Sequence, residues 1–343
     1  MWKTTIFWSV VIVLLSGCHG RNENIMQVEA QGSFAVGGTV LTDSLGRHYH
    51  GDHAYVFYQI PPRARKYPLV FAHGVGQFSK TWETTPDGRE GFQNIFLRRG
   101  FSTYLVDQPR RGNAGRGTES VTLSPVFDEE VWFNRFRVGI YPEYFDNVQF
   151  SRDKDALEQY FRQMTPTVGT ADLDVYSDAY VSLFDKIGPA VFVTHSQGGG
   201  VGWITLPKTK NIKAIVAYEP GSNVPFPEGQ MPEEGKVPTL SGKTEGVEVP
   251  MSVFMEFTKV PIIVYYGDNL PETNERPELY EWTRRLHLMR TWAKMLNALG
   301  GDVTVVHLPE IGLHGNTHFP MSDLNNLDVA EHLAKWLHEK NLD

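Results

Sequence analysis

The sequence predicts an α/β fold with a mostly parallel central sheet of about eight strands, flanked by helices on both faces. Eight runs are rich in β-branched and aromatic residues, and helical stretches separate the later runs. One of these runs ends at a serine, and a cluster of glycines follows it. The length of 343 residues suits one large domain with insertions.

The spacing of the predicted strands changes along the chain. The runs lie at 33–42, 54–60, 67–73, 102–107, 190–195, 212–218, 260–266 and 302–307. Short turns join the first two or three. The predicted helices lie at 92–100, 174–188, 278–300 and 327–340. Alternation of strand and helix indicates parallel pairing, because a parallel strand needs a crossover to return to the same end of the sheet.

Two segments interrupt this alternation. Residues 118–170 contain many aromatic side chains without clean periodicity, and residues 220–259 contain six prolines. Long irregular insertions in a compact domain are often lids or binding loops. We therefore expect one domain over 31–343, with cap or lid insertions at about 118–170 and 220–259.

The N-terminus predicts export. Residues 1–17 contain Lys3 and a short apolar run, which is typical of a signal peptide rather than a membrane span. Leu15-Ser16-Gly17-Cys18 resembles the lipobox of bacterial lipoproteins, which predicts cleavage before Cys18 and lipidation of its sulfur. An ordinary signal peptide with a chance cysteine is the alternative. Residues 18–30 would then form a polar tether from the membrane.

Charge and cysteine content exclude several classes of protein. The formal net charge is −8 and no block rich in lysine or arginine is present, so nucleic acid is not an expected partner. Cys18 is the only cysteine, so an internal disulfide is excluded. His48, His50 and His53 lie close together, but strand alternation would point neighbouring side chains to opposite faces. We expect no metal and no other cofactor.

Residues 191–203 have the pattern of a nucleophile elbow, in which a strand, a sharp turn and a helix present a reactive serine. The expected nucleophile is Ser196, and the glycines at 198–200 allow close backbone approach. Thr194 stands where the motif G-x-S-x-G has its first glycine. The pattern is therefore met only in part.

A serine nucleophile needs a base and an acid that orients the base. The expected base is His318, in a loop just before the final helix, with His314 as the alternative. The expected acid is Glu219, at the end of the strand after the elbow. Asp268, after the next strand, is the alternative acid, and we expect the carboxylate not used to make a structural hydrogen bond.

The sequence also offers donors for a developing oxyanion. Residues 67–73 form a strand that ends in His73-Gly74, and the backbone N–H just past this turn belongs to Val75. The backbone N–H of Gln197 follows the nucleophile at a helix N-terminus. These two groups are the predicted oxyanion hole.

Together these motifs resemble the α/β-hydrolase superfamily over about residues 30–340. His73-Gly74, the segment Trp82–Gly91, Phe96–Gly100 and Val106–Pro109 are similar to a group of bacterial secreted esterases whose triad glutamate follows strand six. The resemblance implies Ser196 as nucleophile, Glu219 as acid and His318 as base. The sequence departs from these relatives at Thr194 and at Arg111, where a glycine-rich turn is common, and it lacks the disulfides that some of them have.

The expected function is that of a serine esterase on small or medium carboxylic esters, anchored through Cys18 in the bacterial cell envelope. A lactonase, peptidase or acyltransferase would share the same residues. A catalytically silent surface lipoprotein that binds a glycan or lipid is the alternative from another class. The sequence leaves open the acyl and alcohol parts of the substrate, the membrane leaflet and the oligomeric state, with a homodimer as one option.

Overall fold

The computed structural model describes residues 25–221, 223–239, 242 and 244–343. The predicted signal peptide at 1–17 and the predicted lipidation site at Cys18 lie outside these residues. Within the described part of the chain, none of the helices combines the length and apolar character that a membrane span requires.

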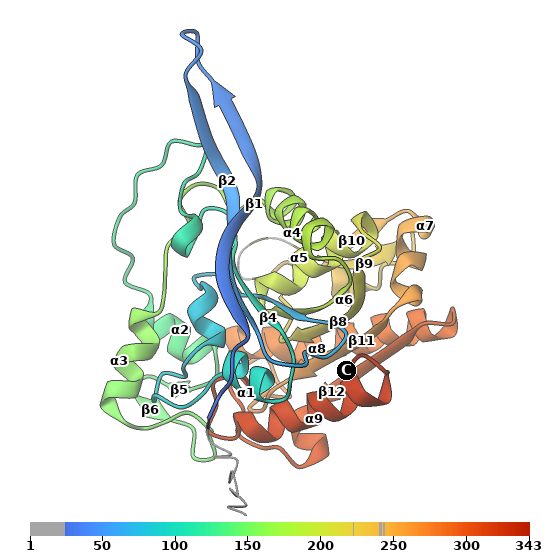
Figure 1. The fold of residues 1–343 in the computed structure, drawn as a ribbon. Helices are drawn as coiled ribbons and strands as arrows, with labels where there is room; N and C mark the ends of the chain where they lie inside the picture. The colour runs from blue at the N-terminus through green and yellow to red at the C-terminus, as the bar shows by residue number, and fades with distance from the viewer. Residues whose placement is uncertain (1–24, 222, 240–241, 243) are drawn as a thin grey trace, which may run out of the picture.

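An eight-stranded sheet forms the centre of the molecule (Figure 1). Its strands are β1 (Ala30–Thr42), β2 (His48–Ile60), β3 (Leu69–Ala72), β4 (Thr103–Asp107), β7 (Ala190–His195), β8 (Ile212–Tyr218), β11 (Pro261–Tyr266) and β12 (Asp302–His307). Their order across the sheet is β1-β2-β4-β3-β7-β8-β11-β12. The β1–β2 and β2–β4 pairs are antiparallel and the other pairs are parallel. The predicted mostly parallel sheet is confirmed.

Helices flank the sheet where the sequence predicts them. They are α1 (Phe92–Arg98), α4 (Leu173–Ile187), α5 (Gln197–Thr205), α8 (Pro277–Ala298) and α9 (Asn326–Glu339), and α1 lies beside α9 while α4 lies beside α5. Local signals set their ends. The carboxylate of Asp172 accepts hydrogen bonds from the N–H groups of Asp174 and Val175 at the start of α4, and Pro277 opens α8.

The two insertions contain short elements. The first has α2 (Glu129–Arg135), β5 (Gly139–Ile140), β6 (Glu143–Tyr144) and α3 (Lys154–Arg162); the second has β9 (Val224–Pro227), α6 (Glu233–Lys236), β10 (Gly246–Val249) and α7 (Met251–Phe254). Short 3-10 helices are η1 (Ser79–Trp82), η2 (Gly112–Ala114), η3 (Leu206–Lys208), η4 (Met255–Lys259) and η5 (Leu308–Ile311). These segments pack on the body instead of forming a separate layer (Figure 1).

The first two strands extend beyond the body as a long hairpin (Figure 1). Their pairing runs from Ala30 opposite Ile60 to Thr42 opposite His48. His48 bonds Thr42 near the exposed tip of this arm. Among the described residues, no group of three or more histidine, cysteine, aspartate or glutamate side chains is placed to hold a metal ion.

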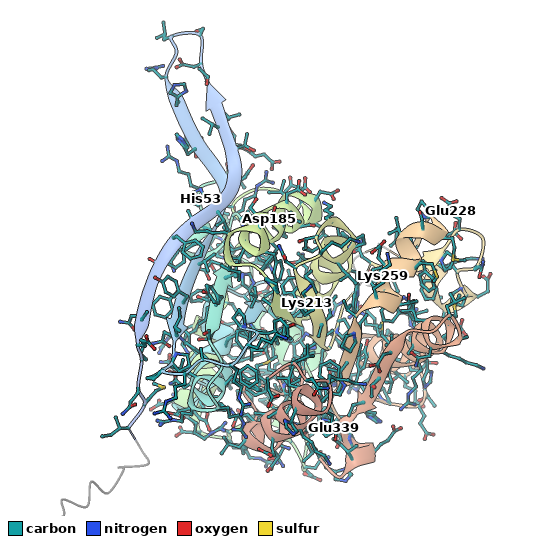
Figure 2. All side chains as sticks on the ribbon, turned by 45° about the vertical axis from the view of Figure 1, so that its right-hand side comes forward. His53, Asp185, Lys213, Glu228, Lys259 and Glu339 are labelled. Carbon is teal, nitrogen blue, oxygen red and sulfur yellow. The ribbon has the colours of Figure 1, made fainter. Side chains whose placement is uncertain are left out.

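The core is centred on the middle strands, whose residues are buried on both faces. Every residue of β3 and β7 is buried, while charged side chains such as Asp185, Glu228 and Glu339 project from the surface (Figure 2). The ring of Phe192 on β7 packs 4.8 Å from the Tyr180 ring of α4, centroid to centroid. This contact braces the strand that leads to Ser196.

We predict that Phe192→Ala lowers the free energy of unfolding by about 3–5 kcal/mol, because it leaves a cavity between β7 and α4. Chemical unfolding followed by tryptophan fluorescence measures the change. The matched control is Phe127→Ala, since Phe127 is 95% exposed and its truncation should change stability by less than about 0.5 kcal/mol. Equal losses for the two variants would contradict this assignment of the core.

Candidate functional site

Ser196 lies at the sharp turn between β7 and α5. Its φ of 53° and ψ of −119° are unfavourable for a residue with a side chain and cost about 1–3 kcal/mol. Hydrogen bonds to the end of β8 hold this conformation, because Ser196 N–H donates to the carbonyl of Tyr218 and Gly221 N–H donates to the carbonyl of Ser196, each at 2.9 Å. The turn therefore keeps the serine at the carboxyl edge of the sheet.

Two close backbone contacts explain the composition of the elbow. A Cβ atom at Gly198 would lie 2.8 Å from the carbonyl oxygen of His73, so a side chain there would force the two turns apart. A Cβ atom at Gly202 would lie 3.1 Å from Cγ2 of Thr194. The glycine at 202 leaves the room that the threonine needs, and the departure from the G-x-S-x-G pattern is accommodated without change to the fold.

The turn after β3 packs directly against the elbow. A Cβ atom at Gly74 would lie 2.8 Å from that of Ser196. The Gly74 carbonyl accepts hydrogen bonds from Nη1 of Arg111 at 2.7 Å and from Nδ1 of His73 at 2.9 Å. In a trans peptide the next N–H points the opposite way, so the N–H of Val75 points away from Arg111.

The protonation of His73 fits this arrangement. Its Nε2 accepts a hydrogen bond from the backbone N–H of Gln108, so the proton lies on Nδ1. Burial, reinforced by the charge of Arg111, lowers the pKa of His73 to about 4. The His73 ring is therefore neutral, and its Nδ1–H donates a hydrogen bond to the Gly74 carbonyl.

Gln197 is the first residue of α5, and its backbone N–H is one of those without a partner inside the helix. Its side-chain oxygen accepts a hydrogen bond from Nη2 of Arg111 at 2.9 Å. Arg111 thus ties the turn at Gly74 to the helix that follows Ser196. Arg111, where the resemblance led us to expect a glycine-rich turn, therefore joins the two turns on either side of Ser196.

Glu219 and His318 meet in the interior. Oε2 of Glu219 lies 3.3 Å from Nδ1 of His318, and both side chains are fully buried. The other oxygen of Glu219 accepts hydrogen bonds from Nη2 of Arg137 and from the backbone N–H of Gly267. β8, which Glu219 follows, is the sixth strand of the main sheet in chain order.

His318 lies next to the elbow. Its ring is 4.6 Å from that of His195, the residue before Ser196, and its carbonyl contacts Nε2 of His195 at 2.8 Å. Among the described residues, Nε2 of His318 has no hydrogen bond partner. No hydrogen bond between His318 and the Ser196 hydroxyl is formed, and hydrogen bonds of this kind are often long in unliganded enzymes.

Aromatic rings and cations surround the imidazole. It stacks on Phe136 at 4.4 Å and lies 4.2 Å from Trp282. Burial, with the charges of Arg137, Arg285 and Arg135, holds the pKa of His318 well below 6.5. His318 is therefore a neutral imidazole near pH 7, the form that can accept a proton.

The alternative residues have other contacts. Asp268 accepts hydrogen bonds from Nδ2 of Asn147 and from the N–H of Gly315, at 3.1 and 2.7 Å, so it ties the loop before His318 to the first insertion. His314 lies 3.8 Å from Asp268 and its side chain is 64% exposed. Asp268 therefore makes structural hydrogen bonds, as we expect of the carboxylate that does not contact His318.

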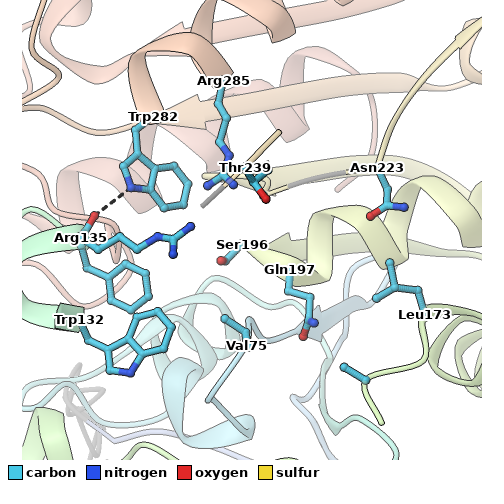
Figure 3. Close-up of a pocket in the computed structure, with 13 residues that line it drawn as sticks. Val75, Trp132, Arg135, Leu173, Ser196, Gln197, Asn223, Thr239, Trp282 and Arg285 are labelled. Atoms are coloured by element: carbon cyan, nitrogen blue, oxygen red, sulfur yellow. Dashed lines mark hydrogen bonds between the residues drawn. The ribbon is translucent and has the colours of Figure 1, made fainter. Parts of the chain in front are cut away.

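A cavity of about 280 Å³ opens in front of Ser196 (Figure 3). The first insertion contributes Trp132, Arg135 and Phe136 to its wall, and the second contributes Gly221, Asn223 and Thr239. Both predicted insertions therefore line the space above the serine. Val75 and Gln197 also line it, so both predicted oxyanion donors belong to residues at the cavity wall.

Arg135 and Arg285 also line the cavity, and buried carboxylates lie beside them. Oε1 of Glu281 accepts hydrogen bonds from Arg135, at 2.9 Å, and from Arg285. Nε of Arg285 also bonds Glu245 at 2.8 Å. Burial raises the pKa of Glu245 to about 7, although Arg285 partly offsets this rise.

Arg135, Arg137 and Arg285 were not predicted from the sequence as residues of the site. Two of them lie in the segment WFNRFRVG (132–139), where cations alternate with aromatic residues in a run without clear periodicity. Cations inside an apolar run are a signal that they have buried partners, because an unpaired buried charge is strongly unfavourable. That signal does not identify the partners.

Comparisons with known proteins agree with this geometry. A model of the alpha/beta hydrolase family matches residues 69–310. A bacterial esterase of known structure is 30% identical to this chain and has a TM-score of 0.73, and the match covers 92% of this chain and 97% of the esterase. A fungal "probable secreted lipase" is 26% identical over 324 residues, which are 86% of this chain and 88% of that protein. The chain belongs to the α/β hydrolase family.

Proposed function

We propose that this protein is a serine esterase that hydrolyses carboxylic esters, with Ser196 as nucleophile, His318 as base and Glu219 as acid. One observation carries the proposal: a strained serine turn faces a cavity, and a buried glutamate–histidine pair lies beside that turn. The likeness to a bacterial esterase and to a fungal secreted lipase supports ester hydrolysis as the reaction.

The first half of the reaction transfers the acyl group to the enzyme. Ser196 Oγ attacks the ester carbonyl carbon while Nε2 of His318 takes the hydroxyl proton. Collapse of the tetrahedral intermediate breaks the bond to the alcohol oxygen, and the imidazolium returns its proton to that oxygen. The alcohol leaves, and the acyl group stays on Ser196.

The second half uses water as the nucleophile. His318 takes a proton from water, the hydroxide attacks the acyl carbon, and the carboxylic acid leaves as the proton returns to Ser196 Oγ. Glu219 bonds Nδ1 and stabilises the imidazolium in both halves. The N–H groups of Val75 and Gln197 would bind the oxyanion, and one such donor is worth about 3 kcal/mol.

We also propose export and anchoring through a lipid on Cys18. The pattern of residues 1–18 supports it, and the fungal relative carries the word secreted in its name. The ribbon of β1 begins at the end of the molecule opposite the hairpin tip (Figure 1). A tether of this length would place the domain close to the membrane surface.

We predict that a fluorophosphonate probe labels the protein and that Ser196→Ala abolishes labelling, because the hydroxyl is the group that would form the covalent bond. His318→Ala should slow labelling by at least about 10³-fold. In-gel fluorescence measures both. Ser182→Ala, on α4 and outside the cavity wall, is the matched control and should label normally. Labelling of Ser196→Ala at the normal rate would refute the assignment.

We predict that Glu219→Gln lowers kcat by about 10³–10⁴-fold, because an amide cannot stabilise the imidazolium or fix the correct tautomer. Asp268→Asn should lower kcat by less than about tenfold, since that side chain bonds Asn147 and the loop before His318, whereas Glu219 contacts the imidazole itself. Steady-state hydrolysis of 4-nitrophenyl butyrate measures both, with thermal unfolding as a check on folding. The reverse order of the two losses would make Asp268 the acid.

We predict that kcat/KM for a neutral ester is constant from about pH 6.5 to pH 8. The base works as neutral imidazole, and because the pKa of His318 is held below 6.5, protonation removes activity only at lower pH. Butyrate released from ethyl butyrate measures the profile, and circular dichroism at each pH checks folding. An acid limb with its midpoint at or above pH 6.5 would contradict the lowered pKa.

A further inference from the structure

Two cationic side chains point at the space above Ser196. Arg135 comes from α2 in the first insertion and Arg285 from α8, and Figure 3 shows both guanidinium groups directed toward the serine hydroxyl. Arg135 has a side-chain exposure of 19% and Arg285 of 7%. Hydrolysis of a neutral ester requires neither cation, because the backbone donors and the Glu219–His318 pair already supply the chemistry.

The cavity wall carries these cations without an opposing charge. Among the described residues that line the cavity, none is an aspartate or glutamate. The carboxylates of Glu281 and Glu245 lie behind the two arginines and are almost fully buried. Oε1 of Glu281 contacts both guanidinium groups and Oε1 of Glu245 contacts Nε of Arg285, so the carboxylates fix the two cations that line the cavity.

Most N–H groups of the Arg135 side chain have no hydrogen bond partner among the described residues. The structure pairs only its Nη2 atom, with Glu281, among the side chains and carbonyls of the described residues. A guanidinium has five N–H donors in a planar fork, a geometry that matches the two oxygens of a carboxylate. In addition, the backbone carbonyl of Arg135 accepts a hydrogen bond from Nε1 of Trp282, which orients the helix end that presents the side chain.

Burial weakens the negative charge that lies behind the two arginines near neutral pH. Two guanidinium groups face two carboxylates, and burial raises the pKa of Glu245 to about 7, so this carboxylate is about half protonated at that pH. Burial is the main cause of the lowered pKa of His318, and the charges of Arg137, Arg285 and Arg135 add to it. A carboxylate in the cavity would meet the two guanidinium groups on the side away from Glu281 and Glu245.

We propose that the cavity selects esters that carry a free carboxylate, which Arg135 and Arg285 bind while Ser196 attacks the ester carbonyl. This proposal rests on the proposed serine esterase function and adds the substrate class. The cavity volume of about 280 Å³ lies near the lower limit of ordinary ligand sites, about 300–1,000 Å³, and therefore favours small substrates. Half-esters of short dicarboxylic acids and short acyl esters of hydroxy acids share this chemistry.

Matched ester pairs test the selection. Methyl hydrogen adipate and methyl hexanoate differ only in a terminal carboxylate in place of a methyl group, with the charge on the acyl side. A second pair consists of 6-acetoxyhexanoate and hexyl acetate, in which the carboxylate lies on the alcohol side. We expect kcat/KM for the charged member of at least one pair to exceed that of its neutral partner by about tenfold or more, as charge-assisted hydrogen bonds allow.

The arginine variant shows whether the cavity causes this preference. In Arg135→Gln the ratio of charged to neutral kcat/KM should fall about tenfold, mainly through KM. Arg290→Gln is the matched control, because Arg290 lies on the same helix as Arg285 but pairs with Glu310 at the surface. The control should keep the ratio of the unmodified protein. A fall in kcat/KM that is equal for both members of a pair would show a general catalytic role and overturn the proposal.

A binding experiment separates this proposal from the proposed function. Calorimetry on full-length Ser196→Ala measures the Kd of each ester without turnover, and we expect the charged member to bind at least about tenfold more tightly. Equal or weaker binding of the charged members would overturn carboxylate selection and leave the esterase proposal intact. Loss of fluorophosphonate labelling specificity for Ser196 would overturn the esterase proposal, whatever the calorimetry shows.

Discussion

The carboxylate of Glu219 is the point on which the site depends. It is fully buried and ion-paired with Arg137, and it also bonds the N–H of Gly267 and contacts His318. These groups come from the end of β8, the first insertion, the end of β11 and the loop before α9. Removal of one partner from a buried ion pair costs about 3–5 kcal/mol. A single buried charge therefore joins four separate parts of the chain.

This junction makes the first insertion part of the candidate site. Besides the Arg137 pair, the N–H of His318 donates to the carbonyl of Phe136 at 2.9 Å, and the two rings stack. The same short segment carries Trp132 and Arg135 at the cavity wall. The position of His318 and the shape of the cavity are thus coupled, so a substitution in this segment should affect substrate selection and proton transfer together.

Elements with a clear local pattern were predictable from the sequence, and long-range polar pairs were not. All eight strands of the main sheet lie where β-rich runs predict them, and the glycines after Ser196 indicate the elbow because they need close backbone approach. The contact of Glu219 with His318 followed from chain order and a family resemblance. Arg137 could not be paired with Glu219, since the two are 82 positions apart and Arg137 lies in a segment without periodicity. Similarly, Gly202 leaves room for the methyl group of Thr194, and this contact across a turn could not be predicted from the sequence pattern.

The cations near Ser196 have opposing effects on a serine mechanism. Burial is the main cause of the lowered pKa of His318, and the field of the cations adds to it. The same field favours the oxyanion of the tetrahedral intermediate, but it disfavours the imidazolium that forms at the same time. Glu219 offsets the second effect, and its pairing with Arg137 weakens that offset. A bound carboxylate beside Arg135 and Arg285 would reduce the positive field where the imidazolium develops. A charged substrate would thereby make the imidazolium of His318 more favourable, and with it proton transfer from Ser196. Recognition of the substrate would then be linked to the chemistry of His318.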